Sequence, residues 1–263
     1  MVLNWYRQAI YSYRGLFGWL SWQSYTSTVV FRPVLNMAIY ALVGKFAINA
    51  LAAQSYVVGM AAYQIPFILL GGITNCLARD RFFGTLPFLY ASRGSRTVSY
   101  FCKGVFHYPN AILAVSIVLF AAWLFLGLDF SHLNWLSLVV SALIIAASGT
   151  AAGLFIGNFA IIINDWATAY GAFAGAMLAL TGVVIPVSSL PGFVSIISQG
   201  LPLTHGLVAF RAAFAGESLA TIGNNILLEL LVGLCYAVVG VALFRFMERE
   251  AKRRGVLDSP GTS

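Results

Sequence analysis

Six long runs of apolar residues follow one another along the chain, and together they predict its architecture. A helix needs about 20 predominantly apolar residues to cross the roughly 30 Å hydrocarbon core of a bilayer. Each run is about this long, so each predicts a transmembrane helix. The predicted spans cover residues 29–50, 55–77, 104–127, 134–159, 166–187 and 223–246. The pattern therefore predicts an all-α integral membrane protein made of one domain over residues 1–263.

Residues 1–24 have a helical period of a different kind. At 100° per residue their apolar side chains fall within an arc of about 120°, whereas Asn4, Arg7 and Arg14 lie outside it. The segment is too short and too polar to span, so it predicts an amphipathic helix that lies in the membrane interface. The apolar arc consists of Tyr6, Ala9, Ile10, Tyr13, Leu16, Phe17 and Leu20.

Residues 186–222 break the pattern of spans, because they are mostly apolar but contain three prolines. Pro186, Pro191 and Pro202 cut the stretch into pieces of about ten residues, which are too short to cross the membrane. We therefore predict an external re-entrant region, in which a helical hairpin dips into the outer leaflet.

Arg211 lies within this apolar region, where an arginine is costly unless it is paired. Glu217, Glu229 and a lipid phosphate are the candidate partners. The alternative is an arginine that extends its charge to the membrane surface and has no special role.

Composition agrees with the membrane class, since 60% of the residues are hydrophobic and only 9% are charged. Soluble domains carry roughly 25% charged residues. The formal net charge is +7, yet of the fifteen Lys and Arg residues only Lys45 and Arg211 lie in alternate loops. The others precede or open the first span, separate the second from the third, or follow the sixth. The positive-inside rule then places both termini in the cytoplasm, with residues 247–263 as a tail, and nucleic-acid binding is not needed to explain the charge.

The sequence lacks the patterns that catalytic and metal sites require. Its three cysteines and three histidines have neither CxxC nor metal-ligand spacing, which indicates embedded thiols and no metal site. There is no G-x-x-x-x-G-K-[ST] phosphate loop, so this chain does not hydrolyse ATP by that route. No Ser-His-Asp or paired-carboxylate set lies on one predicted face. The first fifteen residues also lack a secretory-signal pattern. We therefore expect a protein that is not an enzyme by itself.

Between the second and third spans lies the sequence RDRFFGTLPFLYASRGSR, residues 79–96. Phe82, Leu86 and Leu89 recur at helical spacing, with arginines on both sides. The segment predicts a short cytoplasmic helix that offers its aromatic side chains outward. An exposed apolar patch with a charged rim indicates a protein partner. The alternative is an interfacial helix that lies on lipid.

These features together resemble the membrane subunit of type 2 ABC exporters, the ABC-2 permease family. In the loop after the second span, the charged lead-in at 79–81 is followed by Gly84-Thr85-Leu86, as in that family. The Pro- and Leu-rich stretch before the sixth span and the basic tail MEREAKRRGVLD are also similar. The resemblance covers nearly the whole chain. It implies six transmembrane helices with an interfacial N-terminal helix and a re-entrant hairpin, in a bacterial plasma membrane.

The same resemblance implies that residues 79–96 form a coupling helix that docks on a separate ATP-binding subunit. The arginines and Asp80 would set docking specificity, while Phe82, Phe83 and Leu86 would supply buried contact. Two ATP-binding subunits would hold ATP and Mg, with no cofactor on this chain, and a second permease chain, identical or related, would complete the exporter. The implied coupling residues are Arg79, Asp80, Arg81, Phe82, Phe83, Gly84, Thr85 and Leu86.

The spans contain few polar residues and 14% of the chain is aromatic, which favours a drug-like, amphipathic or lipid-like substrate. A polysaccharide or lipid-linked glycan is the alternative, because aromatic rings also stack on sugars. An ion-coupled carrier or channel would be a function of another class. Such carriers use intramembrane carboxylates, and Glu229 is nearly alone here. A membrane scaffold that only recruits a soluble protein is a third class.

Two runs of small residues, at 148–157 and 170–177, allow helices to approach closely. Gly153 and Gly157 form a G-x-x-x-G pair. Packing within the subunit is the favoured interpretation, and contact between two permease chains is the alternative.

Overall fold

A computed structural model describes residues 23, 26–47, 50–84, 100, 104–105, 107–161 and 165–253. All regular structure in these ranges is helical, which confirms the predicted all-α class. The predicted interfacial helix at 1–24 lies outside the described residues, apart from residue 23. So do residues 85–96 of the predicted coupling loop and residues 254–263 of the predicted tail.

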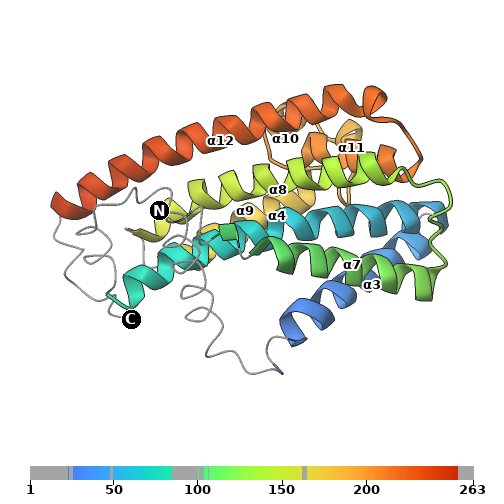
Figure 1. Ribbon diagram of the computed structural model, residues 1–263, viewed down its shortest axis with the longest axis horizontal. Helices are drawn as coiled ribbons and strands as arrows, with labels where there is room; N and C mark the ends of the chain where they lie inside the picture. The colour runs from blue at the N-terminus through green and yellow to red at the C-terminus, as the bar shows by residue number, and fades with distance from the viewer. Residues whose placement is uncertain are drawn as a thin grey trace.

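The long helices lie side by side along the long axis of the molecule, with α4 in the middle (Figure 1). Helix α8 packs on one side of α4 and carries α12 on its own outer side, while α3 and α7 pack on the opposite side. The elements in chain order are η1 (Ser27–Phe31), α3 (Arg32–Ala47), α4 (Ala50–Phe82), α7 (His107–Leu126), α8 (Trp135–Gly157), η2 (Asn158–Ile161), α9 (Trp166–Leu180), η3 (Val187–Ser189), α10 (Gly192–Gln199), α11 (Thr204–Phe214) and α12 (Leu219–Arg253).

Five of the described helices are long and apolar enough to cross a membrane. The number rises to six if the bent pair of α10 and α11 is counted as one span. Helix α9, which begins the predicted fifth span, has 15 residues and is about 22 Å long. It ends at Leu180, seven residues before the predicted end at 187, because Gly182 adopts a left-handed φ of 91°. The bent pair is α10 and α11, which meet at 81° and fit the predicted hairpin.

Close packing of α8 on α4 makes α4 the most buried span. Gly149, Gly153 and Gly157 lie one turn apart on α8 and face the α4 backbone. A Cβ at Gly149 would come within 2.6 Å of the Cα of Pro66, and one at Gly153 within 3.0 Å of the Cα of Leu70. The first run of small residues therefore packs within the subunit, as favoured from the sequence.

The second run of small residues behaves differently. Gly171 and Gly175 on α9 have no atom within 4 Å of the position that a Cβ would take. Both are exposed, as are Thr168, Ala172 and Ala179 on the same side of the helix. This small-residue face of α9 is open in the single chain.

Glu229 lies in α12 and is fully buried, and it holds the start of α11. Its carboxylate accepts hydrogen bonds from the backbone N–H of Leu203 at 2.7 Å and of Gly206 at 2.9 Å. It also accepts one from the Ser148 hydroxyl on α8. Leu203 has a left-handed φ of 89°, which turns its N–H toward this carboxylate. A negative charge at a helix N-terminus is favourable, so Glu229 acts as a cap supplied by another helix.

Arg211 in α11 has different partners from those expected. Its guanidinium donates hydrogen bonds to the carbonyl oxygens of Ser55, Gly182 and Val183, at 2.9 to 3.2 Å. The predicted pairing with Glu217 or Glu229 is therefore wrong among the described residues. The reason is geometric, because the break after α9 leaves the carbonyls of Gly182 and Val183 without helical donors, and the Ser55 carbonyl in α4 lies beside them. Arg211 thus ties the hairpin to α4 and to the end of α9.

Candidate substrate cleft

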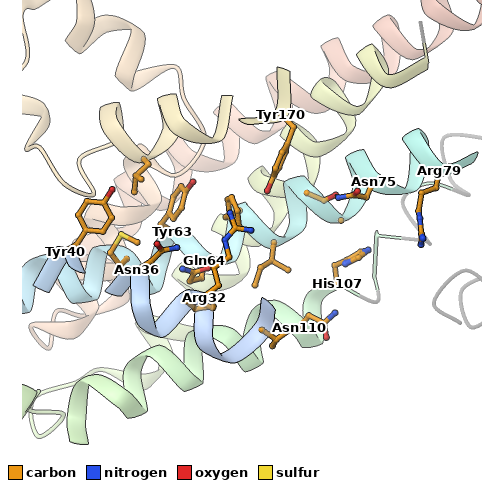
Figure 2. A pocket seen from close by; sticks show the side chains of 18 residues that line it. Arg32, Asn36, Tyr40, Tyr63, Gln64, Asn75, Arg79, His107, Asn110 and Tyr170 are labelled. Atoms are coloured by element: carbon orange, nitrogen blue, oxygen red, sulfur yellow. The ribbon is translucent and has the colours of Figure 1, made fainter. Parts of the chain in front are cut away.

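A cleft of about 460 Å³ lies between α3, α4, α7 and α9, with α4 as its longest wall (Figure 2). The α4 side chains that line it recur every three or four residues, so they form one stripe along the helix. They span about 29 Å from Met60 to Arg79, close to the thickness of a hydrocarbon core. The α4 members are Met60, Tyr63, Gln64, Phe67, Ile68, Gly71, Gly72, Asn75 and Arg79.

The lining of this cleft is amphipathic. Apolar wall comes from Val29, Met60, Phe67, Ile68 and Leu178. Arginines, amides, one histidine and three tyrosines interrupt it. In hydrocarbon such polar groups require partners, so a polar stripe inside a membrane domain marks a path or binding site. The polar members are Arg32, Asn36, Tyr40, Tyr63, Gln64, Asn75, Arg79, His107, Asn110 and Tyr170.

Arg32 lines the cleft from the first turn of α3, and its side chain is exposed. Its guanidinium carbon lies 5.1 Å from the centroid of the Phe67 ring, and Phe67 stands near the midpoint of α4. From the sequence, Arg32 counted with the basic residues that flank the first span. In the structure its exposed side chain lies along the cleft, beside Gln64 (Figure 2). Within the described part of the chain, no carboxylate pairs with Arg32.

Two adjacent glycines on α4 shape the middle of the cleft. A Cβ at Gly71 would lie 2.9 Å from the Tyr170 hydroxyl, and one at Gly72 would overlap the His107 ring. Tyr63 donates a hydrogen bond to the Ala174 carbonyl at 3.0 Å and so ties α4 to α9. Small residues here leave room for rings from neighbouring helices, and those rings form the cleft walls.

The first of the predicted coupling residues, 79–82, form the C-terminal end of α4, the helix that lines the cleft. Helix α4 extends to Phe82, beyond the predicted end at 77, so the charged lead-in forms its last turn and not a loop. Gly84, with a left-handed φ of 66°, ends the turn. Phe82 lies in the last turn of α4, and its predicted helical partners Leu86 and Leu89 lie outside the described residues, as does Thr85.

Two aromatic rings stand exposed at this end of α4. Phe82 is 64% and Phe83 is 63% exposed, and their rings meet edge to face at 5.5 Å. The Arg79 guanidinium lies 5.6 Å from the Phe83 centroid. Arg81 donates a hydrogen bond to the Ala160 carbonyl in η2 at 3.3 Å. The end of α4 is therefore held to η2 by Arg81, while the rings of Phe82 and Phe83 remain exposed.

The predicted external residues lie at the breaks of the hairpin. Pro186 precedes η3, Pro191 precedes α10, and Pro202 lies between α10 and α11. Arg211 lies inside α11 and contacts the carbonyls described above. These four residues position the hairpin, and none of them lines the cleft described here.

The sequence shows few polar residues in the spans, among them Asn36, Gln64 and Asn75, but it does not indicate that they line one cleft. Gln64, Ile68, Gly71, Asn75 and Arg79 recur at intervals of three or four residues, which is the signal that could have identified the α4 wall. The contributions of α3, α7 and α9 depend on tertiary packing and leave no comparable signal in the sequence.

Comparison with known proteins places these features in a family. Residues 8–215 match the ABC-2 type transporter family, and this range contains the cleft and the exposed end of α4. Over 115 residues the chain is 31% identical to Nodulation protein J of Rhizobium meliloti (strain 1021). That match covers 41% of this chain and 41% of the relative.

Proposed function

The chain belongs to the ABC-2 type transporter family, and we propose that it is the permease subunit of an ATP-driven exporter. In this proposal it moves an amphipathic, drug-like or lipid-like molecule out across a bacterial plasma membrane. Membership of the family makes the chain a multi-pass membrane transport subunit and implies association with an ABC ATP-binding subunit. One observation carries the finer proposal. A single helix, α4, lines an amphipathic cleft and ends in an exposed aromatic pair.

The end of α4 supports docking on the ATP-binding subunit. Phe82 and Phe83 are large exposed rings beside arginines, and such rings often supply most of the contact energy at a protein interface. Closure of two ATP-binding subunits on ATP would displace this end. Because Met60 to Phe82 belong to one continuous helix, the displacement would reach the cleft. ATP and Mg would be held by the partner subunits.

The cleft supports an amphipathic substrate. It combines an apolar wall with amides, tyrosines and two arginines. One molecule can therefore place an apolar chain against the wall and a polar head group against the polar side chains. A polysaccharide or lipid-linked glycan remains the alternative, because the amides and tyrosines would also hydrogen-bond sugar hydroxyls.

An ion-coupled carrier receives less support. Glu229 is the buried carboxylate that such a carrier would use, and its oxygens already accept hydrogen bonds from Ser148, Leu203 and Gly206. A carboxylate with this many donors serves as a helix cap. The carrier or channel proposal also predicts transport without an ATP-binding subunit, which the experiment below tests.

A second permease chain, identical or related, would complete the path. The small-residue face of α9 supports this proposal, because Gly171 and Gly175 leave room for a helix of another chain. With both termini in the cytoplasm, the exposed α4 ends of the two permease chains would face the two copies of the ATP-binding subunit.

The proposal is tested by co-purification with a candidate ABC ATP-binding subunit. Phe82→Asp places a charge in the aromatic pair, and Gly84→Pro forbids the left-handed turn that ends α4. Phe46→Asp is the matched control, since Phe46 is exposed at the opposite end of the bundle. We expect the wild type and Phe46→Asp to retain the ATP-binding subunit. For Phe82→Asp and Gly84→Pro, the amount of co-purified ATP-binding subunit should fall at least tenfold.

Retention by the two variants at the wild-type level would contradict docking at the end of α4. If the wild type itself retains no ATP-binding subunit and still transports, the carrier or channel proposal replaces the exporter.

A further inference from the structure

We propose that the cleft along α4 binds the phosphate-type anionic head group of an amphipathic ligand, with Arg32 as the residue that receives the charge. Gln64 and Asn36 would complete the head-group site, and the apolar wall would hold the chain of the ligand. The identification of this ligand as the exported substrate rests on the proposed function. The binding itself does not.

The first argument is the position of the charge. Arg32 falls within the candidate span Val29–Phe46, and its exposed guanidinium lies 5.1 Å from the centroid of the Phe67 ring. An arginine within a span is costly without a counter-charge. Three described carboxylates are engaged elsewhere, and Asp80 lies near the far end of α4, about three turns beyond Phe67. Glu229 caps α11, Asp165 caps α9, and Asp129 binds Ser131 in the turn before α8. In the ranges that the structure describes, the counter-charge of Arg32 has no source in the protein.

The second argument is a set of polar side chains without protein partners beside this charge. Gln64 is only 3% exposed and lines the cleft, yet its amide makes no hydrogen bond to any described residue. Asn36 lies one turn from Arg32 on the same face of α3, lines the cleft, and likewise has no described partner. Gln64 is buried and Asn36 is half-buried, and both amides face the cleft with their hydrogen-bonding groups available to a polar ligand.

The third argument is the geometry of a guanidinium. Arg32 lies over the Phe67 ring, and a guanidinium in this position keeps its N–H donors for another acceptor. Its fork of donors matches the paired oxygens of a phosphate better than a single hydroxyl. Arg79 lines the same cleft at the predicted cytoplasmic end and adds positive potential at the entrance.

The fourth argument separates an amphipathic ligand from a free anion. A cleft that only captured phosphate would need few apolar walls, because desolvation of the ion is costly there. Here the charged site continues into a wall formed by Met60, Ile68 and Leu178. The head group and the chain of one molecule can therefore be satisfied together.

The test is calorimetric titration of the purified chain in nanodiscs of a zwitterionic lipid. The probes are octyl phosphate, octyl glucoside and inorganic phosphate, which separate an anionic amphiphile from a neutral one and from a free anion. We expect octyl phosphate to bind at least tenfold more tightly than either of the others. This comparison uses the wild type alone and does not depend on the folding of any variant.

Variants then assign the charge to its residue. Arg32→Gln should weaken octyl phosphate binding by about 10- to 100-fold, the range for loss of a charge-assisted hydrogen bond. Arg32→Lys should give an intermediate affinity, because it keeps the charge but loses the fork. Arg245→Gln is the matched control, since Arg245 is exposed near the far end of α12, and it should bind as the wild type does.

Equal affinity for octyl phosphate and octyl glucoside would overturn the proposal, as would equal affinity of the wild type and a folded Arg32→Gln. If inorganic phosphate binds as tightly as octyl phosphate, the proposal that the ligand is amphipathic is contradicted. Octyl phosphate that binds but does not stimulate ATP turnover of the complex would leave the head-group site standing and count against its role in export.

Discussion

Glu229 on α12 accepts a hydrogen bond from the backbone N–H of Gly206 at 2.9 Å, and this bond joins the last long helix to the first turn of α11. A Cβ on Gly206 would overlap the Ile145 side chain and lie 3.2 Å from the Glu229 carboxyl carbon, so this close approach favours a glycine. Because α11 belongs to the hairpin, the carboxylate determines where the hairpin sits against α8 and α12.

Glu229→Leu should destabilise the fold by about 2–4 kcal/mol, because it leaves the buried N–H groups of Leu203 and Gly206 without an acceptor. The Ser148 hydroxyl would keep the Ile145 carbonyl as its acceptor. Glu229→Gln keeps an acceptor oxygen and should cost about half as much. The measurement is thermal unfolding in detergent. Glu217→Gln, at an exposed carboxylate two residues before α12, is the control and should unfold as the wild type does.

Two glycines on different helices should respond oppositely to the same change. Gly149→Val should disrupt the contact of α8 with Pro66 and lower the yield of folded monomer. Gly175→Val meets no atom within 4 Å and should leave the single chain folded while weakening association with a second permease chain. Size-exclusion chromatography of both variants measures the two effects. A Gly175→Val chain that unfolds would contradict the open face of α9.

Arg211→Gln should loosen the junction of the hairpin with α4, because it removes the donors to the carbonyls of Ser55, Gly182 and Val183. Hydrogen–deuterium exchange of residues 181–203 should rise at least threefold. The exchange of Arg211→Lys should lie between that of the wild type and that of Arg211→Gln, since an ammonium group reaches fewer of the carbonyls. Lys45→Gln removes an exposed charge at the same end and should leave the exchange unchanged. Unaltered exchange in Arg211→Gln would show that the hairpin is held by apolar packing alone.

The sequence predicted the helices better than their ends. Charged residues at 79–81 indicated a loop, but α4 continues through them because Arg81 binds the η2 backbone and long side chains reach past the apolar core. Pro191 and Pro202 marked the hairpin breaks correctly. The end of α9 was predicted too late, since apolar composition continues past Gly182 while the helix does not.

The site was predicted in part for a physical reason. The exposed rings of Phe82 and Phe83 follow from local composition, so sequence reasoning located them. The partners of Arg211 and Glu229 depend on backbone groups freed at helix ends, and such groups have no residue-type signature. The cleft depends on which helices neighbour α4, and hydrophobic runs alone do not specify that.

The central claim is that α4 links the cleft to the ATP-binding subunit, and ATP turnover of the assembled complex in lipid tests it most directly. Gly71→Leu would fill the cleft where only the end of the Tyr170 side chain must move, while leaving Phe82 and Phe83 unchanged. Gly223→Leu on α12 is the control, because nothing lies within 4 Å of it. We predict that Gly71→Leu retains the ATP-binding subunit but loses at least fivefold in turnover, while Gly223→Leu matches the wild type. Wild-type turnover in a folded, assembled Gly71→Leu complex would contradict the link.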